Sequence, residues 1–135
     1  MFEAIEAVLL AVLFGGMVTF QLLFAPLVFI KIDIGIARPF IRAFFPWYYL
    51  YFGLLALLLT GISYFTENGL LHIVSAASLV GFIISRQVLM PLANRATDNG
   101  DTKGFKIYHM TTVAINTLQL LGFVVVYFSN LILVN

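Results

Sequence analysis

The last long apolar segment, residues 105–130, constrains the fold of this chain more than any other feature. At about 1.5 Å per residue, a helix of this length crosses a hydrocarbon core of about 30 Å. Its polar side chains are concentrated on one side. On a helical wheel, one arc of roughly a quarter turn contains Phe105, His109, Thr112, Asn116, Gln119, Phe123, Tyr127 and Asn130. Because lipid cannot hydrogen-bond an imidazole or a carboxamide, we expect this polar stripe to face other helices or a ligand.

The composition of the whole chain also indicates a membrane protein. Of the 135 residues, 62% are hydrophobic and 10% are charged, whereas soluble domains carry about 25% charged residues. A soluble fold of this size could not bury so much apolar surface, so we expect one transmembrane domain. A net charge of +1 argues against a nucleic-acid partner. The absence of cysteine excludes disulfides, thiolate metal sites and cysteine nucleophiles.

The apolar segments predict an all-α fold, a four-helix transmembrane bundle. The spans are expected at about residues 4–30, 46–65, 70–90 and 105–130. Proline is predicted to kink the first span at Pro26, to open the second at Pro46 and to bend or end the third at Pro91.

Two further local features are predicted, one in the connection after the first span and one in the first span itself. Residues 31–45 mix charged residues with Ile and Phe, which indicates a short interfacial helix with Arg38 and Arg42 on its water-facing side. In the first span, Gly15, Thr19 and Pro26 share one arc, and this small-residue face is predicted to let another helix approach closely.

The basic residues predict the orientation of the bundle. All of them fall in or beside the first and third connections: Lys31, Arg38, Arg42, Arg86, Arg95, Lys103 and Lys106. By the positive-inside rule these two connections face the cytoplasm, and both termini face outside, on the periplasmic side. We therefore expect a multi-pass protein of the cell inner membrane.

Four sequence patterns resemble a known family. They are GGMVTFQLLFAPLVF at 15–29, FPWYY at 45–49, LMPLANRA at 89–96, and the spacing of Phe, His, Thr and Asn in the last span. Together they resemble the DUF4149 family, also called TMEM205-like, which comprises small four-span membrane proteins. The positions that match the family pattern are Gly16, Phe20, Pro26, Phe45, Pro46, Pro91, Phe105, His109 and Asn116. More distantly, such proteins resemble copper-resistance D-type permeases and HemJ-type protoporphyrinogen oxidases, which implies haem or copper handling by analogy of fold.

The polar stripe suggests a ligand pocket in the cytoplasmic half. The candidate residues are His109, Arg86, Asn116, Gln119, Thr112 and Thr19. A neutral imidazole at His109 could bind haem iron or another metal. The planar guanidinium of Arg86 suits a carboxylate, a phosphate or a haem propionate. No catalytic residue is predicted, because Asp and Glu are absent from the interiors of the spans.

Two alternatives to a ligand pocket remain open at this point. The stripe could be a purely structural seam, in which Asn116 and Gln119 bond to Thr19 or to Ser and Thr of neighbouring helices. The aromatic surface could dock the protein to a larger membrane complex or to a second copy of the chain. A metal site is disfavoured because the chain has two histidines, and a tight copper or zinc site usually needs three or four ligands.

Overall fold

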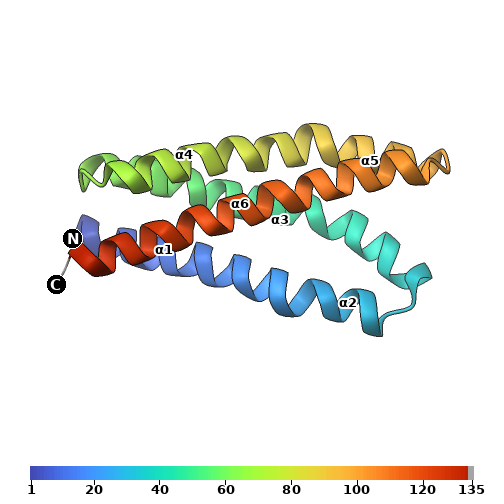
Figure 1. Ribbon diagram of the computed structural model, residues 1–135, viewed down its shortest axis with the longest axis horizontal. Helices are drawn as coiled ribbons and strands as arrows, with labels where there is room; N and C mark the ends of the chain where they lie inside the picture. The colour runs from blue at the N-terminus through green and yellow to red at the C-terminus, as the bar shows by residue number, and fades with distance from the viewer. Residues whose placement is uncertain (134–135) are drawn as a thin grey trace.

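The computed structural model describes residues 1–133, which form an antiparallel bundle of four long helical rods (Figure 1). Each rod is long and apolar enough to cross a membrane, which confirms the predicted four-span architecture. The elements of the rods, in chain order, are α1 (Phe2–Thr19), η1 (Phe20–Phe24) and α2 (Ala25–Lys31); α3 (Ile34–Phe65); α4 (Gly69–Ile84), η2 (Ser85–Leu89) and α5 (Met90–Asp98); and α6 (Thr102–Leu133).

The second rod begins earlier than predicted. Helix α3 starts at Ile34, after Asp33 caps it by accepting a hydrogen bond from the backbone N–H of Gly35 at 2.8 Å. It then continues through Pro39 and Pro46 without a break. The prediction of a separate interfacial helix over residues 31–45 is therefore wrong, as is the prediction that Pro46 begins a helix. Proline is tolerated inside such helices because neighbouring groups can satisfy the backbone atoms it leaves unpaired.

The first and third rods have the same local backbone geometry at their prolines. In each, a single π-helical turn precedes the proline: the N–H of Ala25 bonds to the carbonyl of Phe20, and the N–H of Met90 bonds to that of Ser85. A proline has no N–H and its ring crowds the carbonyl four residues earlier, and a wider turn relieves that crowding. Pro26 and Pro91 thus interrupt the regular α-helix without ending it.

The core lies in the half of the bundle near the termini and around its middle. The largest buried apolar side chains there are Leu13, Met17, Leu59, Leu71, Phe82, Phe123 and Val126. The first rod approaches α3 at Gly16, where an added Cβ would lie 2.9 Å from Cζ of Phe52. Gly15, Thr19 and Pro26, which were predicted to form the packing face of this helix, are exposed. That prediction is therefore wrong, and the next residue, Gly16, makes the close approach instead.

The two ends of the bundle differ in charge. The start of α1, the end of α6 and the α3–α4 connection lie at one end, while the α2–α3 and α5–α6 connections lie at the other (Figure 1). We call the latter the basic end, because it contains Lys31, Arg38, Arg42, Arg95, Lys103 and Lys106. There α2 diverges from α6 and packs little against it (Figure 1). The bundle is consequently open at the basic end and closed at the other.

Candidate ligand-binding cavity

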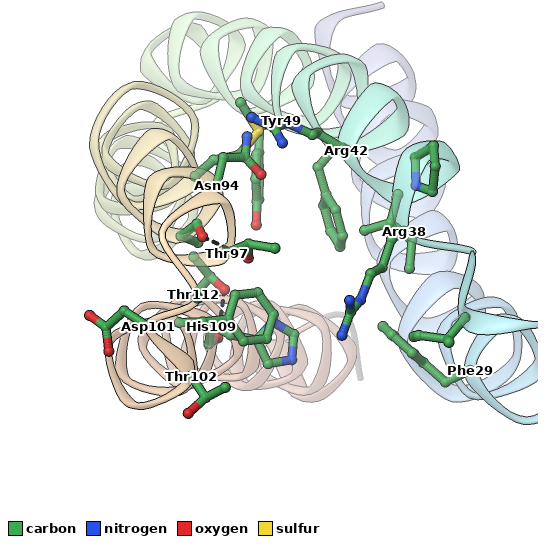
Figure 2. A pocket seen from close by; sticks show the side chains of 18 residues that line it. Phe29, Arg38, Arg42, Tyr49, Asn94, Thr97, Asp101, Thr102, His109 and Thr112 are labelled. Atoms are coloured by element: carbon green, nitrogen blue, oxygen red, sulfur yellow. Dashed lines mark hydrogen bonds between the residues drawn. The ribbon is translucent and has the colours of Figure 1, made fainter. Parts of the chain in front are cut away.

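A cavity of about 650 Å³ occupies the basic end, enclosed by α2, α3, α5 and α6 (Figure 2). Apolar side chains form much of its wall: Phe29, Ile34, Ile41, Phe45, Met90 and Phe105. Polar residues also line it: Arg38, Arg42, Tyr49, Asn94, Thr97, Asp101, Thr102, His109 and Thr112. The side chains of Asp101 and Thr102 point away from the space (Figure 2). Small-molecule sites in proteins have volumes of about 300–1,000 Å³ and combine apolar walls with a few polar groups. This cavity has both properties.

A smaller cavity of about 290 Å³ adjoins the first, between the η1–α2 segment and α6. Its lining shares five residues with that of the large cavity: Phe29, Phe45, Tyr49, His109 and Thr112. The remaining lining residues include Gln21, Pro26 and Asn116. The two spaces therefore meet at His109 and run from the basic end toward the middle of the bundle.

Three of the six predicted site residues come together here. His109 and Thr112 line both cavities, and Asn116 lines the smaller one. The imidazole of His109 is half-buried and stacks on the ring of Phe105, with centroids 5.5 Å apart and planes 7° apart. The hydroxyl of Thr112 donates to the backbone carbonyl of His109 at 2.6 Å, so its hydrogen is directed away from the cavity.

The other three predicted site residues line neither cavity. Nε of Arg86 donates to the carbonyl of Pro46 at 3.1 Å, which ties the third rod to α3. Nε2 of Gln119 donates to the carbonyl of Ser78 at 2.8 Å. Thr19 is exposed on the outer side of α1. The spacing of these residues in the sequence did not reveal which neighbours they meet.

Asn116 belongs to a hydrogen-bonded chain that connects three rods. Its Oδ1 accepts from the hydroxyl of Tyr48 at 3.1 Å, and its Nδ2 donates to Oε1 of Gln21 at 2.9 Å. Nε2 of Gln21 in turn donates to Oγ1 of Thr117 at 3.0 Å. This part of the stripe behaves as the structural alternative expects, although neither Asn116 nor Gln119 bonds to Thr19.

The cationic side of the cavity was not among the predicted site residues. Arg42 forms a bidentate ion pair with Asp98, at 2.7 and 2.8 Å. Arg38 forms no ion pair with any of residues 1–133, and its guanidinium points toward the space between Phe29 and His109 (Figure 2). The i, i+4, i+7, i+11 spacing of Arg38, Arg42, Phe45 and Tyr49 places all four on one helix face. This spacing is not evident in the sequence when Pro46 is interpreted as the start of a helix.

The residues that could hold a metal are few. Within the described part of the chain, no cluster of three or more His, Cys, Asp or Glu side chains is arranged to hold a metal ion. His109 lines the cavities, whereas Nδ1 of His72 lies 3.2 Å from Oγ of Ser63 and 3.1 Å from the carbonyl of Thr60, between α3 and α4. A metal or haem iron in the cavity would therefore meet a single imidazole.

This chain is a multi-pass membrane protein with a partly apolar, partly cationic cavity at one end. No family model, curated protein or solved structure matches it, so its resemblance to the DUF4149 family stays a prediction.

Proposed function

We propose that this protein binds an amphipathic anion in the cavity at its basic end. The ligand class is a molecule with an apolar body and one carboxylate or phosphate group. The observation that supports this most is the combination of a largely apolar cavity of about 650 Å³ with the guanidinium of Arg38, which has no carboxylate partner in residues 1–133. Water in such a space gains little from the Phe and Ile walls, so an apolar ligand that displaces it is favoured, by about 25 cal/mol per Å² of buried apolar surface.

The charge at the rim favours an anion over a cation. Arg42 is neutralised by Asp98, which leaves Arg38 as the available partner for a ligand. A guanidinium can grip two oxygens of a carboxylate or phosphate at once. His109, beside it in the lining, can donate or accept one further hydrogen bond.

The proposal includes an orientation. If the positive-inside rule holds, the basic end faces the cytoplasm and the cavity lies in the cytoplasmic half of the cell inner membrane. The anionic group would then lie near the lipid headgroups, beside Arg38, and the apolar body would point toward Phe45 and Tyr49.

Oleate and oleyl alcohol test the proposal, because they share an apolar chain and differ in charge. We expect purified protein in an uncharged detergent to bind oleate saturably, at one molecule per chain. A hydrogen bond to a charged group contributes about 1.5–3 kcal/mol, so Arg38→Gln should weaken oleate binding roughly 10- to 100-fold and leave oleyl alcohol binding unchanged. Arg95→Gln is the control, because Arg95 is an exposed residue of the same end that lines neither cavity.

Two results would contradict the proposal. One is the absence of saturable oleate binding to the unmodified protein. The other is an equal loss in Arg38→Gln and Arg95→Gln, which would mean that general positive charge attracts the probe.

Haem is one specific member of this ligand class, and the position of His109 in the lining favours it as a second candidate. His109 would hold the iron and Arg38 a propionate. Protein supplemented with haem should show a Soret band that is lost in His109→Ala. A colourless preparation after supplementation would reject haem and leave the broader proposal intact.

A further inference from the structure

We infer that the ligand reaches the cavity sideways from the membrane, through an opening between α2 and α6, and that it is a single-chain amphiphile drawn from the surrounding leaflet. This inference rests on the proposed function, since it assigns a route and a source to the same ligand.

The residues that line the smaller cavity show where this opening lies. One side of it is formed by η1 and α2 and the other by α6. Gln21 of η1 is hydrogen-bonded to Asn116 and Thr117 of α6, whereas α2 packs little against α6. Pro26 on the first side and Val113 on the second are both exposed, so they border the outer mouth of the space. Its inner end reaches His109 and Phe29, which also line the large cavity. A path therefore runs from the lipid-facing surface to the site of the anion.

The chemistry of this path suits an acyl chain. Phe20, Pro26, Phe29 and Val113 line it with apolar surface, which a hydrocarbon chain can cross without losing hydrogen bonds. The polar head would remain at the basic end, near Arg38, while the chain moves between the helices. A hydrated ion would lose its water along the same walls, so the route selects for amphiphiles.

The opening at the basic end is less suited to an acyl chain. Thr97, Asp101 and Thr102 border the large cavity there. They are exposed polar residues, and the carboxylate of Asp101 accepts a hydrogen bond from the N–H of Gly104 at 2.8 Å at the start of α6. A single-chain amphiphile that enters here must first move its apolar chain from the bilayer into water, which is unfavourable, whereas one that enters laterally does not.

Helix α2 is built to act as the movable wall. It carries one buried side chain, Val28, and it is joined to the rest of the first rod through the π-helical turn η1. At its other end the backbone becomes extended at Ile32 before α3 begins. A short segment with little buried surface and an irregular connection on each side can shift at low cost.

The test measures the rate of oleate transfer from neutral phosphatidylcholine vesicles to the reconstituted protein, together with the equilibrium affinity. Val113→Trp places a large ring in the lateral opening, and we expect uptake and release to slow at least tenfold while the affinity changes less than twofold. Asn99→Trp adds the same ring beside the end opening, at an exposed position outside both cavities, and should leave both rates within twofold. Val125→Trp, on an exposed position of α6 outside both cavities, is the control for an added ring.

Closing the lateral opening reversibly, by a cross-link that can be cleaved, separates a blocked route from a misfolded variant. The chain contains no cysteine, so Ala25→Cys with Val113→Cys, which both line the smaller cavity and leave Pro26 in place, can be joined by a cleavable bifunctional maleimide. Cross-linking should slow transfer, and cleavage should restore it in the same molecules. Slower transfer in Asn99→Trp with normal transfer in Val113→Trp and in the cross-linked protein would overturn lateral access in favour of a route from water. Absence of equilibrium binding to the unmodified protein would instead overturn the proposed function, so the two failures can be told apart.

Discussion

Gly16 and Gly15 are adjacent in the sequence but differ in the space available for a side chain. A Cβ on Gly16 would lie 2.9 Å from the ring of Phe52, which is itself wedged between Tyr48 and Phe82. A Cβ on Gly15 would meet nothing within 4 Å. We expect Gly16→Ala to destabilise the protein by about 1–3 kcal/mol through overpacking, as measured by unfolding in mixed micelles. Gly15→Ala should be neutral or stabilising, because alanine favours the helix. Equal effects would contradict the close approach of α1 to α3.

Asn116 supplies a second prediction at the residue scale. Asn116→Ala removes its bonds to Tyr48 and Gln21, and interhelical hydrogen bonds in membranes contribute on average about 0.6 kcal/mol each. We therefore expect a loss of about 1–2 kcal/mol in the free energy of unfolding, with part of it from the space left behind. The control is Thr111→Ala, since the exposed Thr111 hydroxyl bonds to the carbonyl of Ile107 in its own helix. A similar loss in both variants would contradict the interhelical role.

The candidate site could be predicted only in part from single residues. His109, Thr112 and Asn116 were found because an imidazole, a hydroxyl and a carboxamide on one arc of an apolar helix must turn inward. Arg86 could not be placed, because the partner of its guanidinium is a backbone carbonyl of another rod, that of Pro46. Side-chain patterns carry no information about that acceptor.

At the scale of elements, the four long helices were predictable because lipid forces every backbone group to pair within its own segment. Their boundaries were not, since proline removes a local hydrogen bond while tertiary contacts decide whether the helix continues. Helix α3 extends past Pro46 and Pro39 to Ile34, where Asp33 caps it and Arg42 ties it to α5 through Asp98.

The ion pair between Arg42 and Asp98 should contribute little to stability. Both side chains are about half exposed, at 49% and 54%, so water screens the attraction between them. A double-mutant cycle of Arg42→Gln and Asp98→Asn should give a small coupling energy that decreases further in high salt. A large coupling energy that salt does not reduce would mean that the pair is shielded from water.

The π-helical turn before Pro26 gives a prediction about mobility. Pro26→Ala restores a backbone N–H, which lets the segment from η1 to α2 close into a regular helix. We expect the amides of α2 to exchange more slowly with solvent deuterium, and oleate transfer to slow with them. The equivalent change in the third rod, Pro91→Ala, should leave exchange in α2 unchanged. Unchanged exchange in Pro26→Ala would contradict the assignment of α2 as the movable wall.

For the whole molecule, the orientation in the membrane is a prediction from the distribution of Lys and Arg. Because the chain has no cysteine, Glu3→Cys and Asn99→Cys each introduce a single thiol, at exposed positions on opposite ends of the bundle. We expect a membrane-impermeant maleimide added to intact cells with a permeable outer membrane to label Glu3→Cys. Asn99→Cys should be labelled only after the inner membrane is broken. The reverse pattern would place the cavity in the outer half of the bilayer.

The central claim is that the cavity at the basic end holds an anionic amphiphile, and native mass spectrometry of protein extracted in a mild detergent tests it most directly. Ala93→Trp fills the cavity that Ala93 lines, and Ala77→Trp adds the same ring at an exposed position outside both cavities. The account predicts a defined bound mass, identified as an anionic amphiphile, on the unmodified protein and on Ala77→Trp, and its loss from Ala93→Trp. Equal adducts on all three proteins, or none on the unmodified protein, would contradict it.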